Sequence, residues 1–120
     1  KDALDLYHSM TVQVPIETRQ GVLNVPISSI IMVEAQGKKV IVHTTARDYE
    51  SIHTMQYWLD QLPVNRFFQT HRSFIINYEH ITNFDHMLVH LSNGQFTAYL
   101  TKRKYSAFKG AYLLYLESTR

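Results

Sequence analysis

The stretch that decides the fold runs from residue 67 to residue 84 and reads FFQTHRSFIINYEHITNF. Two aromatic residues lead into a polar cluster at residues 69–73, and an apolar triplet follows at once. Apolar segments on both sides of a short polar one are typical of two buried strands joined by a turn. Such a turn holds an imidazole, a guanidinium and a hydroxyl at the surface, either as an ordinary solvated turn or for a binding partner.

Strand patterns dominate the chain on both sides of this stretch. Residues 11–18 (TVQVPIET) alternate, residues 21–36 read as two short strands broken at Pro26, and residues 38–47 alternate again. Further on, residues 86–100 form two alternating strands that meet at Asn93 and Gly94. Asn-Gly is the preferred pair for a type I′ turn, so we predict a β-hairpin there.

Two segments carry a helical pattern instead. Residues 51–62 place apolar side chains three and four positions apart, with Ser51 as the expected N-cap and Pro63 as the stop. Residues 102–119 predict a second helix, whose aromatic stripe consists of Tyr105, Phe108, Tyr112 and Tyr115. The fold class that follows is mainly β, with one short internal helix and a C-terminal helix.

Length and composition set the remaining bounds. A chain of 120 residues that is 45% hydrophobic can build one domain with its own core, and no apolar run reaches the roughly 18 residues of a membrane span. Cysteine is absent, which excludes disulfides and thiolate chemistry. We expect residues 1–12 to be a linker or the tail of a preceding domain, and residues 13–120 to be the domain itself.

No histidine, serine or glycine pattern in the sequence matches a known metal site or catalytic motif. His86 and His90 are four apart in a predicted strand, which separates them by about 13 Å, too far to share one zinc ion unaided. Ser73 and His71 make a tempting pair, but no nucleophile-elbow motif surrounds them. The four glycines lie apart, so there is no phosphate-binding loop. We therefore expect no enzyme activity, no metal site and no cofactor.

Positive charge gathers at predicted turns. The net charge is only +2, yet residues 1–60 carry five Lys or Arg against seven Asp or Glu, and residues 61–120 carry seven against three. This asymmetry permits binding to a polyanion without requiring it. The cationic turns are QGKK at 36–39, HRS at 71–73 and KRK at 102–104.

The KRK turn is the most informative of the three. It is predicted to open the C-terminal helix, where the helix dipole makes each cation unfavourable by roughly 0.3–1 kcal/mol. The same turn exposes free backbone N–H groups, which together with the cations could bind phosphate. A phosphate site and a solvated basic turn both fit this pattern.

The stretch at residues 67–84 also resembles a known family. An apolar pair, then HRSF, two aliphatic residues, Asn77 and a closing HI are similar to the hallmark of the LytTR family, the DNA-binding output domains of many bacterial response regulators. The flanking segments at 27–44, 51–62 and 92–108 are similar to that family as well, in the same order. They include the acidic residue Glu34, and Thr101-Lys102 where Ser-Arg is more common.

The resemblance implies an elongated LytTR-like β fold that presents loops, not a recognition helix, to successive major grooves on one face of DNA. Matched to this sequence, the DNA-binding side chains are Gln36, Lys38, Lys39, His71, Arg72, Ser73, Lys102 and Arg103. The apolar residues around the signature would form core. Asn77 is expected to be structural and to satisfy buried backbone groups.

Physical chemistry suggests roles within this set. Arg72 can make a bidentate contact to guanine or fork onto a phosphate. Lys102 can reach guanine only as a point donor, so its discrimination is softer. Ser73, Lys39 and Arg103 suit phosphate contacts, whereas His71 either donates to a phosphate or holds its turn.

The resemblance therefore implies a sequence-specific DNA-binding domain of a bacterial two-component transcription regulator, located in the cytoplasm. The expected partners are double-stranded DNA, in paired direct repeats that two protomers occupy, and an N-terminal receiver domain in the full-length chain; no membrane is expected. The alternative is a β-rich interaction or dimerisation domain whose basic turns are only solvated.

Overall fold

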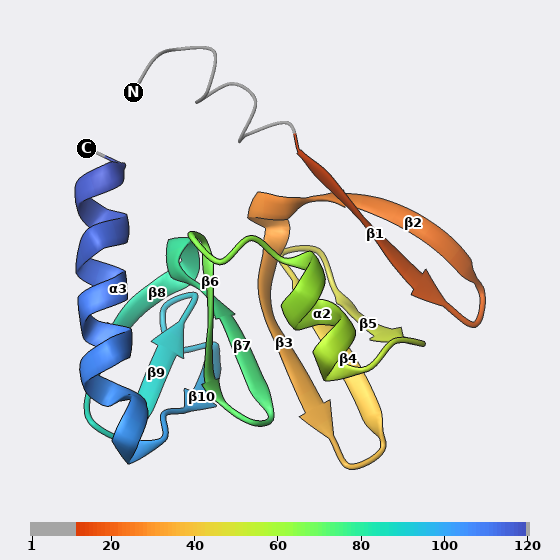
Figure 1. Cartoon of the computed structure of the whole chain (residues 1–120). Helices are drawn as coiled ribbons and strands as arrows, with labels where there is room; N and C mark the ends of the chain where they lie inside the picture. The colour runs from red at the N-terminus through yellow and green to blue at the C-terminus, as the bar shows by residue number, and fades with distance from the viewer. Residues whose placement is uncertain (1–11, 120) are drawn as a thin grey trace.

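The computed structural model describes residues 12–119 (Figure 1). In chain order the elements are β1 (Gln13–Thr18), β2 (Gly21–Pro26), η1 (Ile27–Ser29), β3 (Ile30–Gln36), β4 (Lys39–Thr44), β5 (Asp48–Ser51), α2 (Met55–Gln61), β6 (Phe67–His71), β7 (Phe74–Asn77), η2 (Tyr78–His80), β8 (Ile81–Phe84), β9 (Leu88–Leu91), β10 (Phe96–Tyr99), η3 (Lys102–Lys104) and α3 (Tyr105–Ser118). The predicted fold class, mainly β with a short internal helix and a C-terminal helix, is confirmed. The expected linker at 1–12 lies outside the described residues except for Val12, which packs against the core.

The largest sheet has five strands in the order β5-β4-β3-β7-β6, so β3 lies at its centre. All neighbouring strands in it run antiparallel. β1 and β2 form a separate hairpin, and β8, β9 and β10 form a three-stranded sheet. Figure 1 shows the hairpin on one side of the central sheet, and the small sheet with α3 on the other.

Alternation in the opening stretch divides its apolar residues between two cores. Phe67 and Ile75 point into one core, which they share with the β1–β2 hairpin and with Trp58 of α2. Phe74 and Ile76 point the other way, into a core shared with β9, β10 and Phe108 of α3. Because successive strand residues face opposite sides of a sheet, this one stretch ties both halves of the molecule together.

Asn77 joins the end of β7 to the start of β3. Its side chain is fully buried. The amide Nδ2 donates to the carbonyl oxygen of Ile30 at 2.8 Å, and Oδ1 accepts from the N–H of Glu79 at 2.9 Å. The structural role predicted for Asn77 is therefore confirmed, since both of its partners are backbone groups.

The predicted start of the internal helix is wrong. The helix begins at Met55, with Thr54 as the N-cap whose hydroxyl accepts from the N–H of Tyr57 at 3.1 Å. Ser51 is instead the last residue of β5, where it pairs with Val40, and β5 itself was not predicted. The end before Pro63 is confirmed. Pairing with β4 therefore makes Ser51 a strand residue, although the local sequence pattern is that of a helix N-cap.

The predicted hairpin at Asn93-Gly94 is confirmed. β9 pairs with β10 through Leu91 and Phe96, and the N–H of Gln95 donates across the turn to the carbonyl of Ser92 at 3.2 Å. Asn93 and Gly94 both have positive φ, 58° and 83°. The φ values of Asn93 and Gly94 are those of a type I′ turn. Ser92 also has positive φ, 53°, and the strand ladder ends at Leu91 and Phe96, so the loop is longer than the two residues predicted.

Replacing Gly94 by Val should destabilise the domain by roughly 1–3 kcal/mol, because a β-branched residue is strained at positive φ. Beyond the adjacent residues, no atom lies within 4 Å of the position of a new Cβ, so the strain at positive φ is the expected cause. Urea unfolding would measure the change. The matched control is Asn93→Gly, which keeps the required φ and should be nearly neutral. An unchanged midpoint for Gly94→Val would mean that the turn does not need this conformation.

Candidate nucleic-acid interface

The first predicted turn connects β3 to β4. Gln36 pairs with Lys39, which leaves Gly37 and Lys38 as the two central residues. Gly37 has φ of +63° and Lys38 does not share the positive φ, a pattern expected of a type II′ turn. The side chains of Gln36, Lys38 and Lys39 are all exposed at the tip.

A buried imidazole is linked to this turn by hydrogen bonds through Glu34. His43 is 5% exposed, and its Nε2 and Nδ1 lie 2.8 Å from Glu34 Oε1 and 2.7 Å from Asp48 Oδ1. The same Glu34 oxygen accepts from Nε2 of Gln36 at 3.1 Å. Hydrogen bonds therefore run from β5 through β4 and β3 to Gln36, one of the predicted DNA-binding side chains.

The second turn is the signature HRS between β6 and β7. Arg72 is exposed, with Ser73 beside it, because His71 pairs with Phe74 and closes the strand ladder. The N–H of Ser73 donates to Nδ1 of His71 at 3.0 Å. His71 therefore holds the turn, and Nε2 must carry its ring proton when the ring is neutral. That Nε2–H is the group through which His71 could also donate to a ligand.

The third turn departs from its prediction. Lys102, Arg103 and Lys104 do not form the first turn of the helix; they form the 3-10 turn η3 that precedes α3, and α3 begins at Tyr105. Lys102 and Arg103 are exposed. Lys104 is half-buried and donates from Nζ to the carbonyl of Gln69 at 3.0 Å, and burial first and Arg103 second lower its pKa. Lys104 is thus a structural cation.

Backbone contacts fix the three turns relative to one another. The N–H of Ala35 donates to the carbonyl of Ser73 at 2.9 Å, which links the first turn to the second. The N–H of Thr101 donates to the carbonyl of Thr70 at 2.9 Å, at the bulge in β6, which links the second turn to the third. The pairing of Glu34 with Phe74 brings the first two turns to the same end of the sheet.

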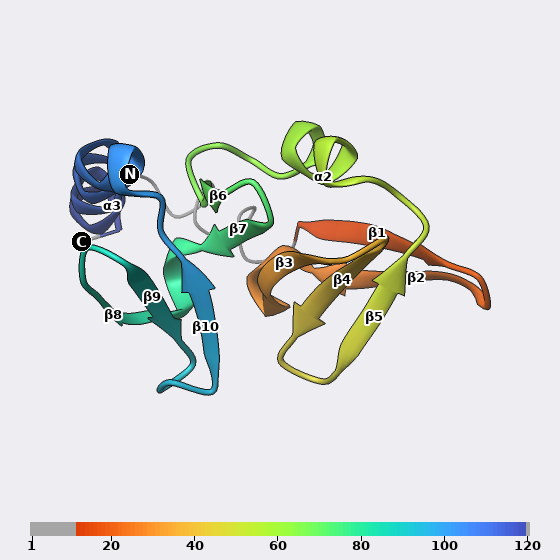
Figure 2. The same cartoon turned by 90° about the horizontal axis from the view of Figure 1, so that it is seen from below.

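The result is a row of turns along one edge. Figure 1 shows the β3–β4 turn, the β6–β7 turn and the start of α3 together at the lower edge of the molecule, and Figure 2 shows them from that side. A cleft between the second and third turns is lined by Gln69, His71, Arg72, Thr101, Arg103 and Lys104. The structure therefore brings His71 and Arg72 of the second predicted group and Arg103 of the third into one cationic cleft. Ser73 and Lys102 do not line this cleft, and the first group lies beside it.

The cations of this edge stand apart from carboxylates. Among residues 12–119, the one Lys or Arg in an ion pair is Arg66, whose Nη2 lies 2.9 Å from Glu79 Oε1. That pair lies near the start of β6, at the end of the strand away from the signature turn. In the described part of the chain, Lys38, Lys39, Arg72, Lys102 and Arg103 have no carboxylate within 4.0 Å.

Tyr99 is absent from the predicted set, yet it lies on this edge. It is 60% exposed on β10, and its ring centroid is 6.0 Å from that of His71 and 5.7 Å from that of Phe74. Alternation in β10 could have found it, because burying Ala98 turns Tyr99 outward.

Two histidines elsewhere have single polar partners: His53 Nε2 lies 2.7 Å from Glu17 Oε1, and His80 Nε2 lies 2.7 Å from the carbonyl oxygen of Ser28. His86 stacks on Tyr105 with centroids 4.0 Å apart, and His90 belongs to β9. Residues 12–119 hold no cluster of three or more acidic or histidine side chains placed for a metal ion. Neither helix of the described chain has the length and hydrophobicity that a membrane span requires.

The fold and this edge define a class of protein. A family model described as the LytTr DNA-binding domain matches residues 20–112. The chain therefore belongs to the LytTR family of DNA-binding domains. A solved LytTr DNA-binding domain of a methyl-accepting/DNA response regulator from Bacillus cereus superposes with a TM-score of 0.70 and 28% identity, covering 82% of this chain and 94% of that one.

Two named bacterial proteins are similar in sequence. The sensory transduction protein LytR of Staphylococcus epidermidis is 28% identical over 85 residues, covering 71% of this chain and 34% of that protein. The transcriptional regulatory protein NatR of Bacillus subtilis is 31% identical over 88 residues, covering 69% of this chain and 38% of that protein. The chain thus spans little more than a third of the length of either relative.

Proposed function

We propose that this domain binds a specific DNA sequence by inserting its three turns into successive major grooves on one face of the duplex. The observation that carries the proposal is the row of exposed cations without carboxylate partners, held at one edge by backbone bonds between the turns. Unpaired cations on a fixed edge match a regular array of phosphates, and they cost no broken ion pair on binding.

The eight side chains divide into base and phosphate contacts. Arg72, at the tip of the central turn, reads guanine through O6 and N7. Gln36 uses one amide hydrogen on Glu34 and keeps its other hydrogen and its carbonyl oxygen for adenine. Lys102 reaches a base as a point donor, with softer discrimination.

The remaining members of the set position the domain on the backbone. These are Lys38, Lys39, Ser73, Arg103 and the Nε2–H of His71, which contact phosphate and carry no sequence information.

The domain acts in this proposal as the output module of a bacterial response regulator. The two relatives are named as a sensory transduction protein and a transcriptional regulatory protein, and the matched segment covers 34% and 38% of their lengths. A receiver domain before residue 13, with residues 1–12 as the connection, and two protomers on paired direct repeats complete the proposal. Such a regulator works in the cytoplasm, where bacterial DNA is.

Gel-shift titration at two salt concentrations tests the proposal against a domain that does not bind nucleic acid. A duplex selected by the domain from a randomised pool should bind with an affinity that falls steeply with salt, because each neutralised phosphate releases counterions. Failure to select or bind any duplex at low salt would favour the alternative, a β-rich protein-interaction domain.

Replacing Lys102 and Arg103 together by Gln should separate binding from stability. Both side chains are exposed, and η3 places them beside the positive end of the α3 dipole, so the melting temperature should stay level or rise slightly. With Arg103 on a phosphate and Lys102 on a base, the slope of log affinity against log salt should fall by roughly 0.9, and discrimination between sites should fall as well. A fall of roughly 1.8 would place Lys102 on a phosphate too.

The matched control removes two exposed cations elsewhere, Arg47 in the β4–β5 turn and Lys109 on α3. Arg47→Gln/Lys109→Gln should keep a slope near that of the wild type. A lower melting temperature together with an unaltered slope for Lys102→Gln/Arg103→Gln would make η3 an ordinary structural turn.

A further inference from the structure

A fourth cationic turn lies beside the first. It connects β1 to β2, where Thr18 pairs with Gly21 and leaves Arg19 and Gln20 exposed at the tip. The Thr18 hydroxyl accepts from the N–H of Gln20 at 3.1 Å and donates to the carbonyl of Gly21 at 3.0 Å. In Figure 2 this turn lies beyond the β3–β4 turn, at the end of the molecule away from α3.

The hairpin that carries this turn is anchored to the central body. The N–H of Ile52 donates to the carbonyl of Glu17 at 2.9 Å, and Oε1 of Glu17 lies 2.7 Å from Nε2 of His53. The His53 ring in turn stacks on Tyr57 of α2, with centroids 3.7 Å apart. The position of Arg19 relative to β5 and α2 is therefore set by backbone and side-chain bonds, and not by the turn alone.

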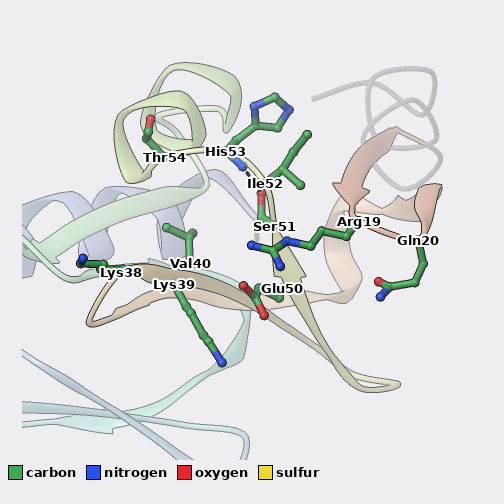
Figure 3. A pocket seen from close by; sticks show the side chains of 10 residues that line it. All are labelled: Arg19, Gln20, Lys38, Lys39, Val40, Glu50, Ser51, Ile52, His53 and Thr54. Atoms are coloured by element: carbon green, nitrogen blue, oxygen red, sulfur yellow. Dashed lines mark hydrogen bonds between the residues drawn. The ribbon is translucent and has the colours of Figure 1, made fainter.

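A cleft opens between this turn, the β3–β4 turn and the end of β5 (Figure 3). Its cations are Arg19, Lys38 and Lys39, and none of them has a carboxylate of residues 12–119 within 4.0 Å. One carboxylate, Glu50, also lines the cleft, so three cations and one anion leave a charge of +2. Figure 3 shows the Arg19 side chain reaching across the cleft toward Glu50 and Ser51.

We propose that this cleft holds a phosphate of the DNA backbone just outside the base pairs that the first turn contacts, with Arg19 as its main ligand. The inference rests on the proposed function, because Lys38 and Lys39 belong both to the cleft and to the first turn. When the first turn lies in a major groove, the DNA backbone that borders this groove passes next to the cleft.

The chemistry of the cleft favours a phosphodiester over a base edge or an enclosed small molecule. The guanidinium of Arg19 presents a planar fork that matches two phosphate oxygens. The cleft is open, with polar side chains such as Gln20 and Thr54 along its wall, so it can line a polymer that passes by. A contact of this kind adds affinity and fixes register without reading sequence.

Arg19→Gln, compared with the wild type on three duplexes, tests the inference. All three contain the site selected by the wild-type domain; one ends close to the site on both sides, and each of the others extends one flank by about five base pairs, half a helical turn. Arg19→Gln should bind about eightfold more weakly at 0.1 M salt, with a salt slope lower by roughly 0.9, on a duplex extended at one flank only. On the other two duplexes it should match the wild type.

Arg47→Gln is the control for net charge, since Arg47 is exposed in the β4–β5 turn and is not among the residues of this cleft. It should leave the slope unchanged on all three duplexes. If the wild type binds and Arg19→Gln keeps the wild-type slope on both extended duplexes, or loses affinity equally on all three, the cleft is not a flanking phosphate site and the proposed function stands. If the wild type binds no duplex, the proposed function and this inference both fail.

Discussion

Asn77→Asp should destabilise the domain by roughly 3–5 kcal/mol at neutral pH, the range expected when a buried charge is left without a partner. The substitution keeps the shape of the side chain and removes the amide that donates to Ile30. A carboxylate would then face the Ile30 carbonyl at about the same 2.8 Å, inside a fully buried site. Denaturant unfolding with a tryptophan signal would measure the loss, since Trp58 is fully buried in the native state.

The pH dependence of that variant has a definite sign. Burial favours the neutral acid, so the pKa of the new Asp in the folded state should lie above its ordinary value of about 3.9. The folded state then binds more protons than the unfolded state between those two pKa values, and the deficit relative to the wild type shrinks as pH falls through the folded pKa. Asn83→Asp, at an exposed position on β8, is the isosteric control and should show neither effect. A deficit independent of pH would show that charge burial is not its cause.

Arg72→Ala should weaken binding to the selected duplex by roughly 1–3 kcal/mol, a loss of about fivefold to 150-fold, because the bidentate contact to guanine disappears. Binding to random DNA should fall much less. Arg72 is exposed at the tip of its turn, and its side chain makes no ion pair among residues 12–119, so the melting temperature should not change. Titration of the variant on selected and random duplexes at one salt concentration measures both losses.

Arg72→Lys sharpens the result, because it keeps the charge and removes the planar fork. It should restore most of the binding to random DNA and little of the discrimination. Equal losses on selected and random DNA for Arg72→Ala, with full rescue by Lys, would make Arg72 a phosphate contact instead.

Much of the fold is readable from the chain because its strands alternate cleanly. The pattern of residues 67–77 alone predicts their arrangement. Alternate apolar residues enter opposite cores, and the polar cluster between them lies in an outward-facing turn. β5 escaped prediction because its four residues, DYES, show no apolar alternation; pairing with β4 makes it a strand. The predicted start of the internal helix was wrong for the same reason. Ser51 fits a local N-cap pattern, but in the structure it pairs with Val40 of β4.

The interface could be predicted less completely. The sequence shows Lys and Arg at predicted turns, and the LytTR hallmark indicates which of these turns to expect at the interface. What the sequence does not show is which cation is used internally. Lys104 looks like its neighbours, but the bulge in β6 offers it the carbonyl of Gln69. Arg19 lies in an ordinary hairpin turn. The bonds from Glu17 to residues 52 and 53, together with the core packing of the hairpin, place it in the same cleft as Lys39.

The bonds from Ala35 to Ser73 and from Thr101 to Thr70 have a mechanical consequence. They make the three turns one stiff body, whereas the duplex that the domain is proposed to bind is an elastic rod. A mismatch between the spacing of the turns and the pitch of the grooves must then be relieved by deforming the DNA, and that energy depends on the stiffness of each base step. Base pairs that no side chain touches would still influence affinity, with flexible pyrimidine–purine steps favoured wherever the rod has to yield.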